Sequence, residues 1–454
     1  MHRPCIYSLV VRLFLSKKII GSEAHYDLGE HVRRTNNIIL QTLLLIGLIT
    51  ITLCVQQVKT YSTTIIVPDD YPTIQEAINH ADEGDIIFVK AGLYIESVIV
   101  NKTVSIIGEN RETTIIEPDP ETQFRITADN VEIKSFKFRK NWLYAVWVES
   151  SNCLIENNNI TGSLGFGGIF LDGRMNNVTG NIVTNNHIVG TDECGVIIWT
   201  GCRNEISFNT ITDNFSGVYI EENSNDNLVF SNNIEDNRDS GIIFVWYSSN
   251  NAIINNNVSG NGWLDEVYIC GIGFQIGSQG NRIISNRILG NRRGVYQGYA
   301  SSNNILHHNS FIDNAIQVLD DSWGYPDIVP HSINIWDNNY PHGGNYWSDY
   351  DGNDTYSGPY QNITGSDELG DIPYIIDMNN TDRYPLMAPY VPILGDLNYD
   401  TRVDITDVAI GSSAFGSYPG HPRWNSLADA NQDGKINIMD IAVVSANFGK
   451  YYEP

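Results

Sequence analysis

The sequence predicts an all-β chain whose short strands stack as a parallel solenoid, followed by a small α-helical domain. Three observations predict this organisation: asparagine is frequent, three kinds of residue recur in phase, and the end of the chain is internally duplicated. Asparagine occurs 51 times in 454 residues, and 31 of these lie between residues 151 and 314. Asparagine and glycine at this density oppose long helices, so turns and short strands are expected there.

The N-terminus is predicted to export the chain. Residues 38–55 form an apolar run that follows Arg33 and Arg34. Such a run is typical of a signal peptide or of an uncleaved membrane anchor, and both readings stay open. We assign residues 1–61 to this leader and expect an extracellular or cell-surface location.

The charge of the chain excludes one class of partner. Asp and Glu number 53 against 27 Lys and Arg, which gives a formal charge of −26. A protein that binds the phosphates of a nucleic acid needs a basic surface, so no nucleic-acid partner is expected. The chain is also 42% hydrophobic, which is too apolar for a disordered segment.

Residues 62–390 carry a repeat with three landmarks. The first landmark is an asparagine beside apolar residues, at Asn130, Asn152, Asn177, Asn204, Asn227, Asn251, Asn281 and Asn304. The second is an apolar residue that closes an asparagine cluster, at Ile160, Ile188, Ile211, Ile234, Val258, Ile288 and Phe311. The third is a glycine before alternating apolar residues, at Gly168, Gly195, Gly217, Gly241, Gly271 and Gly294. The asparagines are spaced 22 to 30 residues apart, and a unit of this size cannot bury its apolar face alone. The units are predicted to stack as a parallel β-helix, with aligned asparagines forming hydrogen-bonded ladders.

Both ends of this region resemble known β-helix proteins. Residues 71–78 are predicted to form a short amphipathic helix that caps the open end, and residues 85–89 and 104–108 the first strands. With residues 91–94 (AGLY), this stretch resembles the start of pectin-lyase-like right-handed β-helix proteins. Residues 345–350 (NYWSDY) and 382–387 (DRYPLM) resemble the C-terminal end of NosD-like β-helix proteins. That family contains carbohydrate-binding proteins, sugar-cleaving enzymes and a copper-site maturation protein, so the resemblance implies a right-handed coil but no single activity.

Residues 396–454 contain a duplication with a period of 33 residues. The first copy carries Asp396, Asn398, Asp400, Asp404 and Asp407, and the second carries Asp429, Asn431, Asp433, Asn437 and Asp440. Side-chain oxygens at loop positions 1, 3, 5, 9 and 12, with a backbone carbonyl at position 7, form the oxygen shell that Ca²⁺ prefers. The carbonyls at position 7 belong to Arg402 and Lys435. The sequence therefore predicts two calcium ions, although Thr401 replaces in the first loop the sharp-turn glycine that Gly434 supplies in the second.

This tandem pair resembles a dockerin type I domain, with residues 391–395 as its linker. The resemblance implies a cohesin-bearing partner that binds the helices after the loops. Family members often carry a Ser-Thr pair at loop positions 10 and 11. Here these positions hold Ile405, Thr406, Ile438 and Met439, which we expect to contact the partner. The alternative is a domain that binds calcium only to stabilise the end of the chain.

The strands that follow the repeated glycines predict a carbohydrate-binding face. Alternate residues should point inward, at Val146, Ile169, Val196, Val218, Ile242, Ile272 and Val295. The candidate sugar-binding side chains on the outer face are Trp147, Phe170, Trp199, Tyr219, Tyr296 and Glu149. Weaker candidates for catalysis are Asp172, Glu221, Asp265 and Glu266, because a glycosidase or lyase needs carboxyl groups at its site. The alternative is that a loop or another subunit covers this face.

These observations predict an exported protein that binds a polysaccharide, with the question of degradation by a lyase or hydrolase left open. Two alternatives are a non-enzymatic adhesion scaffold and a copper-site maturation factor. Copper is not expected, because no Met- or His-rich cluster is present and the adjacent His307 and His308 should point to opposite faces of a strand. The cysteines of the repeats are expected to be free and mostly buried, since Cys194 and Cys270 lie three coils apart.

Overall fold

The structure is a computed structural model that describes residues 62–118, 123–140, 143–163, 166–264, 268–324 and 330–452. The chain divides into two compact units, Met1–Tyr61 and Ser62–Pro454. The predicted leader, with its apolar run at 38–55, lies outside the described residues. Within the described ranges, no helix is both long enough and apolar enough to cross a membrane.

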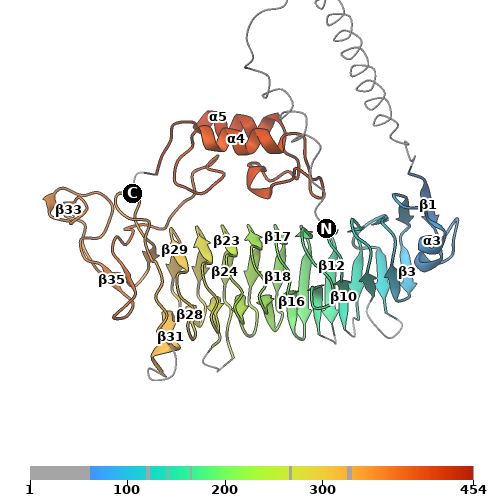
Figure 1. The fold of residues 1–454 in the computed structure, drawn as a ribbon, viewed down its shortest axis with the longest axis horizontal. Coiled ribbons are helices and arrows are strands. Elements are labelled where there is room, and N and C mark those ends of the chain that lie inside the picture. The colour runs from blue at the N-terminus through green and yellow to red at the C-terminus, as the bar shows by residue number, and fades with distance from the viewer. Residues whose placement is uncertain are drawn as a thin grey trace, which may run out of the picture. The chain divides into compact units, whose positions relative to one another are not determined.

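Short parallel strands stack into the predicted right-handed β-helix, with three sheets running along it (Figure 1). Sheet A contains β1 (Thr64–Val67), β2 (Ile86–Val89), β5 (Ser105–Gly108), β8 (Glu132–Lys134), β11 (Leu154–Glu156), β14 (Ile182–Thr184), β17 (Glu205–Ser207), β20 (Leu228–Phe230), β23 (Ala252–Ile254), β26 (Arg282–Ile284) and β29 (Ile305–His307). Sheet B contains β3 (Gly92–Ile95), β6 (Thr114–Glu117), β9 (Lys137–Arg139), β12 (Asn159–Ser163), β15 (His187–Thr191), β18 (Thr210–Thr212), β21 (Asn233–Glu235), β24 (Asn257–Ser259), β27 (Arg287–Leu289), β30 (Ser310–Ile312) and β32 (Tyr346–Trp347). Sheet C contains β4 (Val98–Val100), β7 (Phe124–Ile126), β10 (Tyr144–Val148), β13 (Gly167–Asp172), β16 (Cys194–Trp199), β19 (Ser216–Glu221), β22 (Ile242–Val245), β25 (Ile272–Phe274), β28 (Arg293–Gln297) and β31 (Ile316–Asp320).

The interior of the coil is filled by apolar side chains from all three sheets. In one turn these are Ile206 from sheet A, Ile211 from sheet B, and Val218 and Ile220 from sheet C, all with no exposed surface. The strands alternate inward and outward residues because successive side chains of a strand point to opposite faces. The predicted inward column from Val146 to Val295 is confirmed, since its members are paired from strand to strand and are all fully buried.

Buried asparagines at the corners between sheets form the predicted ladders, and there are three of them. The ladder before sheet A runs through Asn181, Asn204, Asn227, Asn251, Asn281, Asn304 and Asn334. The ladder between sheets A and B runs through Asn158, Asn186, Asn209, Asn232, Asn256, Asn286, Asn309 and Asn345. The ladder before sheet C runs through Asn214, Asn237, Asn261, Asn291 and Asn314. Each side-chain oxygen accepts the backbone N–H and the side-chain amide of the asparagine one coil earlier, as Asn227 does from Asn204 at 2.9 and 3.1 Å.

Three of the predicted landmark asparagines are wrong as ladder members. Asn130 and Asn152 lie one residue before the ladder position, at left-handed backbone angles with φ of 58°. Asparagine tolerates this conformation at turns, which explains their presence. Asn177 is exposed, and the ladder position of its coil is Asn181, whose oxygen accepts the N–H of Cys153 at 2.9 Å.

The repeated glycines mark a corner where the backbone of the next coil comes too close for a side chain. A Cβ atom on Gly217 would lie 2.4 Å from the carbonyl oxygen of Gly241, and one on Gly195 would lie 2.5 Å from a methyl group of Ile211. Both distances are shorter than van der Waals contact allows. The repeated glycines therefore mark the positions where neighbouring coils pack closely against each other.

The two ends of the β-helix are covered. Helix α3 (Ile74–His80) buries Ile74, Ala77 and Ile78 against the first coil, as the sequence predicts. At the other end, η1 (Asp321–Gly324) and two small hairpins, β33 (Tyr356–Ser357) with β34 (Ile363–Thr364) and β35 (Tyr374–Ile375) with β36 (Thr381–Asp382), follow the last coils. The carboxylate of Asp382 is fully buried there and accepts the N–H of Asn345 at 2.7 Å, so it terminates the second ladder.

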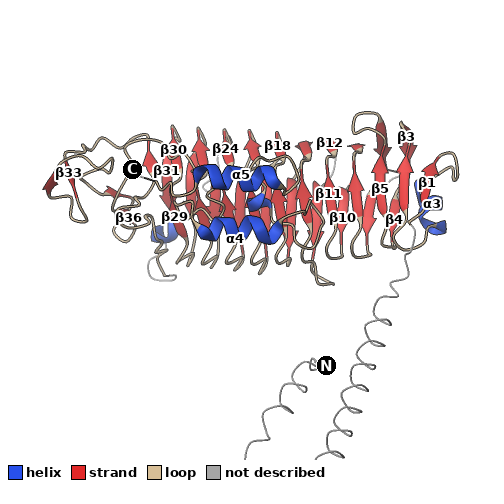
Figure 2. Cartoon of the chain, turned by 90° about the horizontal axis from the view of Figure 1, so that it is seen from above, coloured by secondary structure: helices blue, strands red, loops and turns tan. Residues whose placement is uncertain are grey.

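The C-terminal module contains α4 (Ile405–Ala414), η2 (Ser426–Ala428) and α5 (Ile438–Asn447), and the two longer helices lie side by side in both views (Figures 1 and 2). Its own small core consists of Leu397, Val403, Ala414, Ala428, Ile436 and Val444. The module contacts the β-helix through Trp424, whose indole N–H donates to Glu205 at 3.4 Å, and through Tyr399, whose ring lies 6.2 Å from that of Phe230.

Candidate functional site

An aromatic cluster lies on the outer face of sheet C, where the sequence predicts a carbohydrate-binding column. Strand pairing places Trp147 beside Phe170, Phe170 beside Ile197, and Ile197 beside Tyr219. The cluster consists of Tyr144, Trp147, Phe170, Cys194, Ile197, Trp199 and Tyr219. Apolar groups gathered outside the core of a soluble protein typically mark a binding surface.

A pocket of about 670 Å³ opens over strands β16, β19 and β22 of this sheet. We call it the sheet C pocket. Its aromatic lining is Tyr144, Trp199, Phe215, Tyr219 and Tyr268. Its acidic lining is Asp192, Glu193, Glu221 and Asp239, and the remaining lining residues are Cys194, Ile197, Ser216, Ile243 and Gln275. Aromatic rings can stack on the C–H groups of a sugar, and neighbouring oxygen acceptors can accept hydrogen bonds from its hydroxyls.

Glu221 is the most perturbed acid of the sheet C pocket. The residue is only 8% exposed. Burial, together with the negative charge of Glu222, raises the pKa of Glu221 to about 7, although Arg174 opposes the shift. Among the described residues, no hydrogen bond or ion pair reaches the Glu221 carboxylate. Burial also raises the pKa of Glu193. Carboxyl groups with raised pKa values in a pocket are candidates for proton donors.

Titration of Glu221 should make the free energy of unfolding fall as pH rises from about 4.5 to about 7. In the unfolded chain the carboxyl ionises near 4.5, but in the folded chain only near 7, so the unfolded state holds fewer protons in this window. Glu221→Gln removes this titration. The stability of the variant relative to the wild type is therefore expected to increase with pH, as measured by urea unfolding at both ends of the window. Asp226→Asn, at an exposed carboxyl, is the control, and a pH-independent difference for Glu221→Gln would contradict the expectation.

The remaining predicted site residues have different environments. Phe170 is 1% exposed and Tyr296 is 5% exposed, so neither ring is available to a sugar. The guanidinium of Arg174 lies 5.3 Å from the Phe170 ring and 4.3 Å from the Trp199 ring. The hydroxyl of Tyr296 donates to Asp321 at 3.1 Å.

The predicted carboxylates are also held by partners. Glu149 forms an ion pair with Arg125, with an Nε–Oε2 distance of 2.6 Å. Asp172 accepts two hydrogen bonds of 2.8 Å from Arg174. Burial alone would raise the pKa of Asp172, but these bonds hold it below its usual range, so Asp172 is unsuited to donate a proton. Asp265 and Glu266 lie outside the described residues.

Tyr144, which lines the pocket, and Glu222, which contacts the pocket residue Trp199, escaped prediction because they depart from strict alternation. Tyr144 lies two residues before the inward Val146 and should share its face. The alternation breaks between them, since Ala145 and Val146 are both buried, and the Tyr144 ring lies 4.7 Å from that of Phe170 on the outside. Glu222 adopts a left-handed backbone with φ of 54° at the end of β19, and its carboxylate accepts the indole N–H of Trp199.

The two predicted calcium loops have matching geometry. Asp396 accepts the N–H of Thr401 at 2.8 Å, and Asp429 accepts the N–H of Gly434 at 2.9 Å. Thr401 and Gly434 share a φ of 77°, so threonine adopts the turn that glycine makes in the second loop. Each loop leads into its helix through a capping box, with Asp404 and Asp407 in the first and Asn437 and Asp440 in the second.

The donors of these loops fit calcium chemically. The carboxylates at positions 1 and 12, Asp396, Asp407, Asp429 and Asp440, are all at most 5% exposed. Within the described ranges, no three His, Cys, Asp or Glu side chains come together in an arrangement that holds a metal. The loop donors, however, include amide and backbone oxygens, which suit Ca²⁺ rather than a transition metal. The predicted partner-contact residues lie on the surface, with Ile405, Ile438 and Met439 exposed by 70, 65 and 59%, and Thr406 also exposed.

The environment of His307 and His308 corrects one prediction and fits copper poorly. The two rings do not point to opposite faces: His308 has a left-handed backbone with φ of 56°, and the two Nδ1 atoms lie 2.9 Å apart. His308 Nε2 lies 2.6 Å from the carbonyl oxygen of His342, so it donates there and its Nδ1 accepts from His307. Both nitrogens of His308 are therefore engaged. The segment around these two histidines, residues 267–352, contains no methionine and one cysteine. It therefore offers few of the soft ligands that copper prefers.

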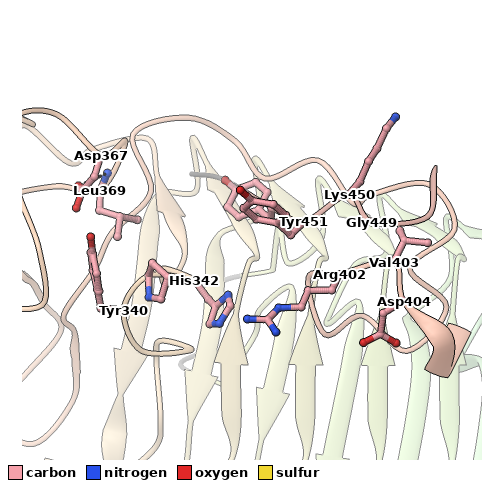
Figure 3. A pocket seen from close by; sticks show the side chains of 12 residues that line it. Tyr340, His342, Asp367, Leu369, Arg402, Val403, Asp404, Gly449, Lys450 and Tyr451 are labelled. Carbon is pink, nitrogen blue, oxygen red and sulfur yellow. Dashed lines mark hydrogen bonds between the residues drawn. The ribbon is translucent and has the colours of Figure 1, made fainter.

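A second cavity, of about 650 Å³, lies where the cap of the β-helix meets the C-terminal module (Figure 3). Tyr340, His342 and Leu369 line it from the cap, and Arg402 and Val403 line it from the module. Burial, assisted by the positive charge of Arg402, lowers the pKa of His342. None of the predicted sugar-binding residues lines this junction.

The cysteines of the repeats are free, as predicted. Cys153, Cys194 and Cys270 are buried, and Cys202 is partly exposed. Burial raises the pKa of Cys153 to about 11 and that of Cys270 to about 12, so both stay protonated and behave as small apolar side chains.

Three parts of the chain match known protein families. Residues 124–272 match the right handed beta helix region, residues 267–352 match periplasmic copper-binding protein (NosD), and residues 394–448 match the dockerin type I domain. These matches confirm the β-helix, NosD-like and dockerin resemblances found in the sequence. No curated protein matches the chain.

Several solved structures are similar to the β-helix. The mannuronan C-5 epimerase A-module of Azotobacter vinelandii is 14% identical, with a TM-score of 0.40 over 58% of this chain and 89% of its own. The alginate lyase of Paenibacillus sp. is 15% identical, with a TM-score of 0.43 over 63% of this chain and 97% of its own. The catalytic domain of a GH87 alpha-1,3-glucanase is 14% identical, with a TM-score of 0.40 over 63% of this chain and 69% of its own. At these identities the likeness concerns the fold alone.

Proposed function

We propose that this chain is an exported protein that binds a polysaccharide in the sheet C pocket and is tethered to a cohesin-bearing protein by its C-terminal module. One observation carries the first part: aromatic rings and carboxyl groups meet in a pocket of about 670 Å³ on the outside of the coil. The rings of Trp199 and Tyr219 would stack on the apolar faces of sugars, and Glu193, Glu221 and Asp239 would bond to hydroxyls.

The tether rests on the two calcium loops and on the exposed residues that follow them. The dockerin match covers both loops and both helices. In this proposal two calcium ions order the loops, with Arg402 and Lys435 each supplying a backbone carbonyl. Ile405 and Thr406 of the first copy correspond to Ile438 and Met439 of the second, 33 residues later. These exposed, mainly apolar positions would form the surface that the cohesin covers.

The test for polysaccharide binding uses retention of residues 62–454, with calcium, on a panel of immobilised polysaccharides. Trp199→Ala and Tyr219→Ala are each expected to weaken binding about tenfold, which corresponds to about 1.4 kcal/mol. The loss follows from removing one stacking surface. Neither residue belongs to the core of the coil, since both are only half-buried, so both variants should fold.

Tyr360→Ala is the matched control, because Tyr360 is 82% exposed and lies in the C-terminal cap. It should leave retention unchanged. Sugars released during the same experiment would identify cleavage: unsaturated uronic ends for a lyase, and reducing ends without unsaturation for a hydrolase. Equal retention of the wild type and both pocket variants would show that polysaccharide binds outside the sheet C pocket. No retention at all would favour the adhesion scaffold.

A further inference from the structure

The charge of the sheet C pocket bears on the class of glycan it can hold. Four carboxyl groups line it, from Asp192, Glu193, Glu221 and Asp239, and none of its lining residues is a Lys or Arg. A ligand that entered with a carboxylate of its own would meet like charges in a partly dehydrated space, where Coulomb repulsion is stronger than in water.

Two arginines near the pocket, Arg174 and Arg238, already interact with other groups. Arg174 donates two hydrogen bonds of 2.8 Å to Asp172 and lies against the rings of Phe170 and Trp199. Arg238 donates to the carbonyl oxygens of Thr191 at 3.2 Å and Asp192 at 3.4 Å, and packs on the ring of Phe215. Arg174 therefore presents no open pair of N–H groups that could bind a carboxylate in two places. The guanidinium of Arg238 lies 3.9 Å from the carboxylate of Asp192, with which it forms an ion pair.

Glu221 provides an independent sign that the pocket faces a ligand. It is more than nine-tenths buried and lines the pocket, yet its carboxylate has no hydrogen-bond or ion-pair partner among the described residues. Its carboxylate oxygens are accessible rather than enclosed, so they can bond to a ligand that enters the pocket. A sugar hydroxyl can donate to this group or accept from it, whereas a uronate carboxylate can only accept.

We propose that the sheet C pocket binds uncharged sugar units and excludes uronate units. This inference rests on the proposed polysaccharide binding and narrows it to neutral glycans. The aromatic rings would stack equally well on neutral and charged sugars. The carboxyl groups would discriminate between them, because they form hydrogen bonds with sugar hydroxyls and repel the carboxylate of a uronate.

The test compares a polyuronate with the same polymer after chemical reduction of its carboxyl groups to primary alcohols. The two ligands share linkage and ring shape and differ in charge. In the presence of calcium, residues 62–454 are expected to bind the reduced polymer at least tenfold more tightly than the native one. A triple variant, Asp192→Asn with Glu193→Gln and Glu221→Gln, should reduce this preference severalfold by admitting the uronate.

A second triple variant controls for the acidity of the whole protein. Asp213→Asn, Asp226→Asn and Asp351→Asn remove the same number of charges from exposed residues outside the pocket, and the preference should remain as in the wild type. Uronate binding equal to or stronger than that of the reduced polymer would overturn the inference while leaving polysaccharide binding intact. An equal loss of preference in both triple variants would also overturn it, since the cause would then be net charge. Failure to bind either polymer, or any neutral glycan of the panel, would overturn both proposals.

Discussion

Replacing Asn232 with alanine is expected to lower the free energy of unfolding of the β-helix by about 3 to 5 kcal/mol. Asn232 lies in the middle of the second ladder and is 2% exposed. Its amide group donates to the carbonyl oxygens of Ile206 at 2.8 Å and Phe230 at 3.1 Å, and to the side chain of Asn256 at 3.0 Å. Its oxygen accepts the backbone N–H and the side-chain amide of Asn209 at 2.9 and 3.0 Å.

The cost is high because alanine leaves both neighbouring coils with unpaired groups. The N–H of Asn209 and the carbonyl of Ile206 would stay buried without their partner, and each unsatisfied buried group costs about 1 to 3 kcal/mol. The measurement is the urea midpoint of the purified chain, followed by far-ultraviolet circular dichroism. Coils of a solenoid contact mainly their neighbours, so the coils next to Asn232 can unfold before the others. The same destabilisation would then appear as an additional transition at lower urea concentration that accounts for only part of the circular dichroism change.

Asn177→Ala is the matched control in the same solenoid. Asn177 is exposed, and its side chain makes no hydrogen bond within the described part of the chain. Its substitution should change the free energy of unfolding by less than about 0.5 kcal/mol. Equal midpoints for Asn232→Ala and Asn177→Ala would show that the ladders contribute little to stability.

The parts of the fold that could be predicted from the sequence are those fixed by local geometry repeated in every coil. Inward residues such as Val196 and Val218 were predictable because a strand alternates its side chains with period two. Gly195 and Gly217 were predictable as a column, although only the structure gives the reason, which is contact with the following coil. The calcium loops were predictable because their donors follow one another at fixed spacing in a single stretch of chain.

The pocket could be predicted only in outline, because its lining comes from strands and from the turns before them. The two outward columns, one with Tyr219 and one with Trp199 and Glu221, follow from alternation. The burial of Phe170 does not, since it depends on Arg174 reaching back from the next turn. Tyr144 lies outside the coil only because the alternation breaks after it. The alternation is also interrupted at His307 and His308, because the left-handed backbone of His308 departs from the geometry of a regular strand.

Removing calcium is expected to unfold the C-terminal module while the β-helix stays folded. The module buries the four carboxylates Asp396, Asp407, Asp429 and Asp440 around a core of six apolar residues, Leu397, Val403, Ala414, Ala428, Ile436 and Val444. Without a cation, the paired acids of each loop repel one another in a partly dehydrated space. At a free calcium concentration of 1,000 times the Kd, each bound ion adds about 4 kcal/mol to stability, which is comparable to what so small a core can supply.

Hydrogen exchange measured by mass spectrometry separates the two parts of the chain in one experiment. On addition of a calcium chelator, peptides from residues 396–452 should lose protection by a factor of 100 or more, whereas peptides from the coils between residues 124 and 320 should keep theirs, because the ladders contain no metal ligand. Cohesin binding should be lost in parallel, since Ile405 and Ile438 are held at the surface only by the folded helices. Asp396→Ala with Asp429→Ala should reproduce the effect in the presence of calcium, and Asp351→Asn with Asp226→Asn, which change exposed carboxyl groups of the β-helix region, should not. Unchanged protection of both helices after chelation would mean that the small core and the two capping boxes suffice to fold the module, and that its acidic loops serve a purpose other than calcium.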